Sequence, residues 1–299
     1  MQTTNQILMI RPIDFKFNAQ TAGNNKFQQK SSTQSVQNLA LNEFDGFVNL
    51  LRNHGVSVMV IDDTLTPETP DSIFPNNWIS FHENGEVILY PMFSENRRAE
   101  RRNEILTRIG QDFKIDKITD LSSYETDNVF LEGTGSLVLD RVNKIAYAGL
   151  SLRTDKKVLA AFCSKTGYST VVFNAVDVKG FPIYHTNVMM CIGDAFAVVC
   201  FDSIPDIAEK QKLRQSFINT NKEVIEISFE QMNQFAGNML QVNENLLVMS
   251  EQAYLSLNNK QIATLEKYCK LIYAPLYTIE KNGGGSARCM LAEIHLPQL

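Results

Sequence analysis

A cysteine near the C-terminus has the sequence surroundings of a nucleophile. Cys289 follows the glycine run Gly283–Gly285 and Arg288, and residues 290–294 are predicted to form a strand. Three glycines permit backbone conformations closed to other residues and a close approach to a neighbouring group. Arg288, next to the thiol, favours the reactive thiolate. The alternative is a glycine turn before an edge strand, with Cys289 as a small core residue. This segment alone leaves both interpretations open.

Other residues able to do chemistry recur at a nearly constant spacing. Glu132, His185 and Asn238 each stand at or just before a predicted hairpin, and successive members are 53 residues apart. Asn77 lies 55 residues before Glu132, and Cys289 lies 51 residues after Asn238. A fixed period of this kind is the signature of a repeat architecture.

The elements around these residues repeat as strand, strand, helix, strand. Alternating and valine-rich runs predict the strands, Asn84–Gly85 marks a hairpin turn, and apolar residues at helical spacing predict the helices. Four units follow one another, with their elements at 78–81, 87–90, 95–109 and 113–118; 135–139, 144–148, 155–166 and 169–173; 188–192, 195–200, 205–217 and 223–227; and 238–242, 246–249, 259–269 and 271–274.

A fifth unit is assembled from the two ends of the chain. The strand after Cys289 pairs with a strand at 7–10, and a helix at 34–54 and a strand at 56–61 complete the unit. Such units cannot bury their faces alone, so we expect them to pack around one axis. The prediction is a single-domain, five-bladed α/β-propeller over residues 1–299. Its equivalent positions converge at one end of the axis, and these are Asn77, Glu132, His185 and Cys289.

A cysteine, a histidine and a glutamate that converge support nucleophilic catalysis with the histidine as proton carrier. Each has a structural alternative. His185 alone suits a strand-end structural histidine, and Glu132 alone suits a loop carboxylate held by backbone amides. Because unrelated structural residues have no reason to share a repeat phase, the shared phase favours catalysis.

Composition limits the class of protein. The 299 residues are 44% hydrophobic and 20% charged with a net charge of −5, which fits a globular protein without a nucleic-acid footprint. No run is long and apolar enough for a membrane helix, and the N-terminus lacks a signal-peptide pattern. Five cysteines and four histidines without ligand spacing argue against a metal site and suggest reduced thiols in the cytoplasm.

The three motifs around Glu132, His185 and Cys289 resemble those of the guanidino-group modifying superfamily. This superfamily includes arginine deiminases, dimethylarginine dimethylaminohydrolases and amidinotransferases, which share a five-bladed α/β-propeller (pentein). The resemblance covers nearly the whole chain. It looks closest to the bacterial citrulline-utilisation hydrolase branch, through residues 74–78, 130–136 and the terminal glycine–cysteine run.

The resemblance implies roles for individual residues. Cys289 resembles the nucleophile that attacks the central carbon, His185 the acid/base, and Glu132 the carboxylate that assists it. Arg153 resembles the arginine that pairs with a substrate carboxylate, and Arg98 is a weaker candidate for that work, because it also suits a solvated helix face.

Two positions depart from the arginine-using members of the superfamily. Carboxylates that clamp a guanidinium correspond here to Asn77 and Asn187. An amide can donate hydrogen bonds, which an ionised carboxylate cannot, and a ureido oxygen needs a donor. The substitution therefore suits a ureido substrate.

We therefore expect a cofactor-free hydrolase of a ureido or guanidino C–N bond, with the amino acid citrulline as the leading substrate, giving ornithine, carbon dioxide and ammonia. The alternatives are an arginine deiminase, a dimethylargininase or an amidinotransferase. A hypothesis from another class is a non-catalytic propeller that binds a macromolecule. The glutamate, histidine and cysteine count against it, because such a scaffold needs none of them. The sequence leaves open a homo-oligomer, the acceptor that resolves the intermediate, and the role of residues 18–27.

Overall fold

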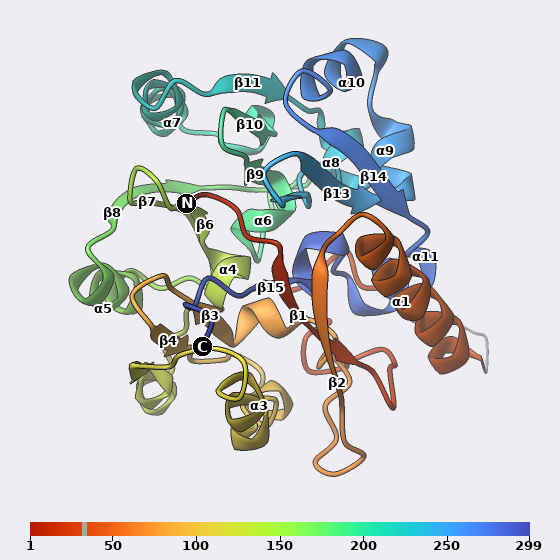
Figure 1. Cartoon of the computed structure of the whole chain (residues 1–299). Helices are drawn as coiled ribbons and strands as arrows, with labels where there is room; N and C mark the ends of the chain where they lie inside the picture. The colour runs from red at the N-terminus through yellow and green to blue at the C-terminus, as the bar shows by residue number, and fades with distance from the viewer. Residues whose placement is uncertain (32–34) are drawn as a thin grey trace.

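Each predicted unit forms one three-stranded sheet (Figure 1). The computed structural model describes residues 1–31 and 35–299. The sheets consist of β15 (Ala292–Glu293), β1 (Gln6–Arg11) and β2 (Ser57–Asp62); β3 (Ile79–Phe81), β4 (Glu86–Leu89) and β5 (Lys117–Asp120); β6 (Val138–Asp140), β7 (Ile145–Leu150) and β8 (Ser169–Asn174); β9 (Met190–Ile192), β10 (Phe196–Val199) and β11 (Glu223–Glu226); and β12 (Leu240–Val242), β13 (Leu246–Ser250) and β14 (Lys270–Ala274).

All five sheets share one topology. The middle strand pairs antiparallel with one neighbour and parallel with the other. The parallel pair needs a crossover connection, which the helices of each unit supply. As predicted, the first sheet joins the two ends of the chain, because β15 lies beside β1 with Ile7 opposite Glu293 (Figure 1).

Helices cross over between the second and third strands of each unit. They are α1 (Val36–Asn53); α2 (Glu95–Arg98) with α3 (Asn103–Ile109); α5 (Lys156–Thr166); η3 (Phe201–Ser203) with α7 (Ile207–Asn219); and α9 (Glu251–Ser256) with α10 (Asn259–Leu265). Three further helices connect successive units, and these are η2 (Ser122–Asp127), α8 (Phe229–Asn233) and α11 (Tyr277–Gly283).

Several helix predictions need correction. The helix predicted over 95–109 is broken between α2 and α3, where Arg102 adopts an extended conformation before α3. The helix predicted over 259–269 ends at Leu265, and α9 before it was not predicted. Leu39 belongs to the apolar residues at helical spacing that predicted the helix at 34–54, but in α1 it is 43% exposed and Ala40 is buried instead. The predicted start of that helix at Gln34 lies outside the described residues.

A short helical turn precedes the first strand in four units, and three of these turns overlap the predicted start of the strand. These turns are η1 (Pro75–Asn77), α4 (Gly133–Ser136), α6 (Thr186–Met189) and η4 (Ala287–Met290). Consequently β6, β9 and β15 begin later than the sequence indicated. Independently of these turns, β5 begins at Lys117 and not at the predicted Phe113. The turns contact one another: α4 with η1, α4 with α6, and η1 with η4. They carry the candidate functional residues.

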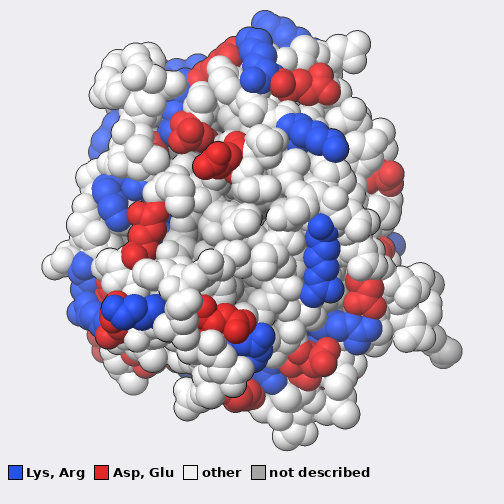
Figure 2. All heavy atoms as spheres, in the orientation of Figure 1, with Lys and Arg blue, Asp and Glu red and all other residues white. Residues whose placement is uncertain are grey.

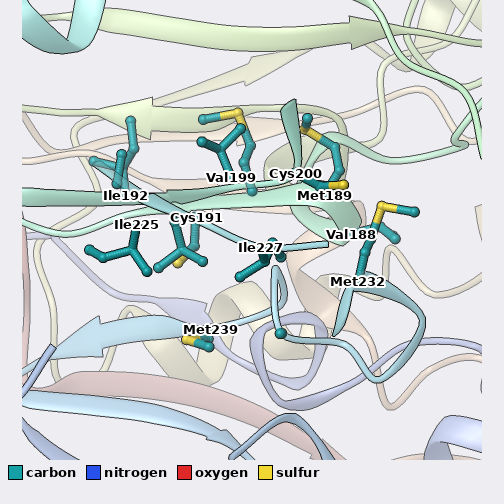
Figure 3. Close-up of a cluster of buried hydrophobic side chains, with 14 of the residues drawn as sticks. Val188, Met189, Cys191, Ile192, Val199, Cys200, Ile225, Ile227, Met232 and Met239 are labelled. Atoms are coloured by element: carbon teal, nitrogen blue, oxygen red, sulfur yellow. The ribbon is translucent and has the colours of Figure 1, made fainter. Parts of the chain in front are cut away.

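The core lies between the sheets and their helices. Its largest cluster packs β9, β10 and α7 together and is rich in sulfur, with Met189, Met232, Met239, Cys191 and Cys200 among its members (Figure 3). Neighbouring sheets also contact each other through their inner strands, as β15 with β3, β6 with β9, and β9 with β12.

On the face shown in Figure 2, lysine and arginine side chains are interspersed with aspartate and glutamate. Among residues 1–31 and 35–299, no helix combines the length and the apolar character needed to span a membrane.

Candidate active site

A small cavity of about 10 Å³ lies where the short turns meet. Four of the predicted site residues line it: Asn77 from η1, Arg153, His185 and Cys289. Glu132 and Asn187 stand behind this lining, where they bond to His185 and Cys289 respectively. Asp71, Phe74, Arg97, Tyr184, Asn25 and the glycine run complete the walls. Asn238, just before β12, also bonds to Cys289, so residues from all five units meet here or immediately behind the lining.

Glu132 and His185 form a buried pair. Each immediately precedes a single helical turn, α4 or α6, and Nε2 of His185 lies 2.7 Å from Oε2 of Glu132. Glu132 also accepts from the backbone N–H of Phe93 at 3.0 Å and from Nη1 of Arg153 at 3.3 Å. The carboxylate is thus held by three donors, one of them a formal cation.

The two groups have opposite preferences for charge. Burial alone would raise the pKa of Glu132, but Arg153 and His185 outweigh it and hold the pKa well below its usual range. Burial lowers the pKa of His185 to about 4, although Glu132 acts in the opposite direction. At neutral pH the pair is a carboxylate beside a neutral imidazole. An ionised carboxylate only accepts, so the proton sits on Nε2 and Nδ1 is the basic nitrogen.

Two asparagines hold the sulfur of Cys289. Nδ2 of Asn238 lies 3.3 Å from Sγ, and Nδ2 of Asn187 lies 3.5 Å from it. The thiol is 3% exposed in η4 and borders both the hydrophobic core and the cavity. The sequence left open whether Cys289 is a core residue or a nucleophile. The structure is compatible with both interpretations, because the residue borders the core and the cavity.

Arg288 does not serve the thiolate as its sequence position suggested. Its guanidinium points away from Cys289 and donates to the carbonyl of Leu291 at 2.8 Å and to Glu293 at 2.7 Å. A buried arginine requires partners for its donors, and Glu293 supplies a full charge.

Asn77 is oriented by a buried ion pair. Its Oδ1 accepts from Nη1 of Arg97 at 2.7 Å, and Arg97 in turn forms a two-pronged contact with Glu100 at 2.8 and 2.9 Å. Because arginine only donates, this contact fixes the amide with its nitrogen turned away from Arg97. One hydrogen of Nδ2 goes to Oδ1 of Asn76 at 2.9 Å.

Gly135 shows where the rest of that amide points. A Cβ built on Gly135 would lie 2.5 Å from Nδ2 of Asn77 and 2.7 Å from Nδ1 of His185. The two nitrogens therefore meet over a glycine that no larger residue can replace without moving them. The second N–H of Asn77 is available on the His185 side of the cavity.

Arg98 is not brought into the cavity. Its guanidinium bonds to the backbone carbonyls of Met92 and Phe93 and lies 3.6 Å from Glu125. The structure places its neighbour Arg97 at the site instead, buried to 2% exposure. The helix-face interpretation assumed one continuous helix, and the break after Arg98 removes that geometry.

Arg153 lies in the cavity but already has partners. Besides Glu132, its guanidinium donates to Oδ1 of Asn24 at 3.0 Å and to the carbonyl of Thr21 at 3.3 Å, and it stacks on the ring of Tyr184. Asn24 and Thr21 belong to the polar segment 18–31. That segment also contacts the glycine run, through Asn25 and the carbonyl of Gly283 at 3.2 Å.

The glycine run packs closely against its neighbours, and no room is left for a side chain at these three positions. Gly284 caps α11 with a φ of +65°, and a Cβ there would lie 2.6 Å from Asn25. The hydroxyl of Tyr184 donates to the carbonyl of Gly284. The run was predicted to allow a close approach to a neighbouring group, and that group is segment 18–31.

Several lining or contacting residues were not proposed from the sequence, and three of them have charged or amide groups that bear directly on the chemistry. Asn238 had the correct repeat phase, which was a usable signal. Arg97 lies beside Arg98, and only its burial distinguishes the two. Asp71 had no signal. Its carboxylate accepts from Asn18 at 2.8 Å, its other oxygen has no hydrogen-bond partner among the described residues, and burial raises its pKa. In the same described ranges, no cluster of three or more metal-binding side chains is found.

A family model described as N,N dimethylarginine dimethylhydrolase, eukaryotic, matches residues 11–296. The chain belongs to this family. It is therefore a member of the guanidino-group modifying pentein superfamily and an enzyme of the class that hydrolyses guanidino-type C–N bonds. No curated protein sequence matches the chain closely enough to count as a relative.

Solved structures share the fold. The N-terminal domain of ArgZ, an arginine dihydrolase from the ornithine–ammonia cycle in cyanobacteria, was solved bound to substrate; it superposes with a TM-score of 0.78 at 16% identity over 98% of this chain and 99% of that domain. The chain spans 41% of the longer ArgZ chain. A Pseudomonas aeruginosa dimethylarginine dimethylaminohydrolase (DDAH) mutant complexed with citrulline gives 0.67 at 19% identity, over 97% and 99%.

Proposed function

We propose that this enzyme hydrolyses the ureido group of citrulline, with Cys289 as the nucleophile. The products are ornithine and carbamate, and carbamate decomposes to carbon dioxide and ammonia. The observation that carries the substrate assignment is the fixed orientation of Asn77, because it places an amide donor beside Nδ1 of His185.

A ureido group differs from a guanidinium in charge and in its oxygen. The oxygen accepts hydrogen bonds and takes on negative charge during attack, so donors stabilise it. Near Cys289 the amides of Asn77 and Asn187 supply donors at places where a guanidinium would require acceptors. Unmatched polar groups in a buried site cost the wrong substrate several orders of magnitude in rate or affinity.

The reaction follows from the protonation states of the site. His185 accepts the thiol proton at Nδ1, and the sulfur of Cys289 forms a bond to the ureido carbon. The bond from that carbon to the side-chain nitrogen of the substrate breaks as the imidazolium returns the proton to the leaving amine. Ornithine departs and a carbamoyl thioester remains on Cys289.

Water completes the cycle. His185 takes a proton from a water molecule whose oxygen attacks the thioester carbon, and the carbon–sulfur bond breaks to release carbamate and the thiol. Glu132 stays ionised throughout and stabilises the imidazolium that forms in each half. One water is consumed for each citrulline.

The amino-acid end of the substrate has complementary partners in the same cavity. Arg153 suits its carboxylate, and the unpartnered carboxylate oxygen of Asp71 suits its ammonium group. Arg153 is already bonded to Asn24 and Thr21 of segment 18–31, so these contacts have to break before Arg153 pairs with a substrate carboxylate.

A guanidino substrate is the second candidate. The family match favours it, and the ionised Glu132 gives the site one carboxylate close to His185. Under this alternative the enzyme releases ammonia or a methylamine from arginine or a methylated arginine through the same covalent step.

A substrate panel separates the two. The purified enzyme is incubated with citrulline, arginine and methylated arginines at equal concentration, and ornithine, citrulline and ammonia are measured. The proposal predicts ornithine from citrulline with the highest kcat/KM of the panel. Citrulline accumulating from arginine, with no ornithine from citrulline, would establish the guanidino alternative instead.

We further propose that the five sheets close into one five-bladed propeller that forms a single domain of residues 1–299, and that the enzyme works in the cytoplasm. Contacts between the inner strands of neighbouring sheets support the closed arrangement.

A further inference from the structure

Asn238 has one orientation only, and it points a donor at the nucleophile. Its Oδ1 accepts from the backbone N–H of Arg288 at 3.1 Å, and its Nδ2 donates to the backbone carbonyl of Asn187 at 2.8 Å. Flipping the amide would oppose two oxygens and leave the Arg288 N–H without its acceptor. Nδ2 is therefore the atom that faces Sγ of Cys289 at 3.3 Å.

The other donor to the sulfur is less constrained. Asn187 places Nδ2 at 3.5 Å from Sγ, but its Oδ1 has no hydrogen-bond partner among the described residues, so no second contact fixes its amide. Both residues are buried, and they differ in that Asn238 has further hydrogen-bond partners that fix its amide. The fixed donor is Asn238.

A hydrogen-bond donor matters more to a thiolate than to a thiol, because a bond to a charged acceptor is about twice as strong as one between neutral groups. A guanidinium substrate brings a positive charge that itself favours the thiolate. A neutral ureido substrate brings none, and Arg288 is turned toward Glu293. The protein must then stabilise the thiolate of Cys289 through neutral hydrogen-bond donors.

We propose that Asn238 is a catalytic residue of this enzyme, which stabilises the thiolate that Cys289 becomes when its proton passes to His185. The inference rests on the proposed function, because a neutral substrate is what makes this donor necessary. It assigns chemistry to the one repeat-phase residue that otherwise has only a structural explanation.

Alkylation of the free enzyme by iodoacetamide tests this without any substrate. The modification rate of Cys289 is followed by peptide mass spectrometry across a pH series for the wild type, Asn238→Asp and Asn238→Ala. Aspartate keeps the acceptor for Arg288 and loses the donor to the sulfur. Loss of a hydrogen bond to a charged group costs about tenfold, so we expect alkylation at neutral pH to slow by about tenfold in both variants. The lost rate should return at higher pH.

The control for added charge is Asn219→Asp at the exposed end of α7, which should alkylate like the wild type. Thermal unfolding is measured in parallel, and Asn238→Ala decides the question if the aspartate variant does not fold. The inference is overturned by wild-type alkylation in Asn238→Ala, or by slowing that is equal at every pH, which would indicate altered access. Since no substrate is present, these outcomes are independent of whether citrulline is cleaved.

Discussion

Nε2 of His185 lies 2.7 Å from Oε2 of Glu132, although 53 residues separate the two in the chain. Neither side chain is more than 2% exposed, and each stands at the entrance to the first strand of its own sheet. Convergence of equivalent positions in successive repeats therefore produces the pair. Because the carboxylate fixes the proton on Nε2, it decides which nitrogen of His185 faces the chemistry.

Glu132→Gln should fold but turn over slowly. The amide cannot offset the charge of an imidazolium, so the loss falls on the transition state and appears in kcat, with an expected decrease of at least about tenfold. Steady-state kinetics on citrulline measures this, with circular dichroism as the check on folding. An unchanged kcat with a raised KM would identify Glu132 as a binding residue only.

Gly135→Ala should abolish activity. The added Cβ would lie 2.5 Å from Nδ2 of Asn77 and 2.7 Å from Nδ1 of His185, so both side chains must move. Overpacking of this kind costs ~1–3 kcal/mol of stability, and a displaced proton carrier costs far more in rate.

The matched control is Gly46→Ala in α1, where a Cβ meets nothing within 4 Å. Alanine has the higher helix propensity, so this variant should gain about 0.5–1 kcal/mol of stability at wild-type activity. Full activity in Gly135→Ala would show that the meeting of Asn77 and His185 is not needed for catalysis.

Asn77→Asp should invert the substrate preference. The carboxylate would form an ion pair with Arg97 and lose the N–H that faces His185. We expect citrulline turnover to fall, since a donor to the ureido oxygen contributes about tenfold or more. Arginine binding should tighten because a guanidinium gains an opposite charge. Adding Asn187→Asp should enlarge both effects. Calorimetry and initial rates with both substrates measure them, and improved citrulline turnover would contradict the assignment.

Acid should destabilise the fold through buried histidines. Burial lowers the pKa of His185 and His295 to about 4 and that of His82 well below its ordinary value. Between about pH 6.5 and 4 the unfolded chain binds more protons at these positions than the folded one, so stability falls as pH falls.

The histidine that tests this away from the active site is His82, which bonds to Ser80 at 2.9 Å. In His82→Gln the drop in unfolding free energy between pH 7 and 5 should be smaller than in the wild type, by about 1–2 kcal/mol. Denaturant unfolding at both pH values measures the difference. Identical drops would show that His82 does not titrate during unfolding. Glu100 and Glu280, whose pKa values are raised by burial from 4.5 to about 7 and 8, act in the opposite direction over an overlapping pH range and are unchanged in this variant.

The repeat phase predicted much of the arrangement. It placed Asn77, Glu132, His185 and Cys289 in one region before any contact was known, because the period fixes which positions share an end of the axis. It also predicted that the chain ends complete one sheet, as β15 and β1 do.

What periodicity does not describe is the direction of individual side chains. Nothing in the sequence distinguishes Arg97 from its neighbour Arg98 as a site residue. The break after α2 decides which of them is buried. The amide of Asn238 is oriented by backbone groups of two other units, contacts that only the folded chain contains. Arg288 was expected to assist Cys289, but Glu293, five residues further on, takes its charge.

The most direct measurement is the identity of the covalent intermediate. Citrulline carrying ¹³C at the ureido carbon is mixed with the enzyme, the reaction is quenched during turnover, and the peptide containing Cys289 is analysed by mass spectrometry. We expect a labelled carbamoyl group on Cys289 in the wild type and none in Cys289→Ser, which should form no ornithine. Ornithine produced at the wild-type rate by Cys289→Ser, or a labelled adduct on another residue, would contradict this expectation.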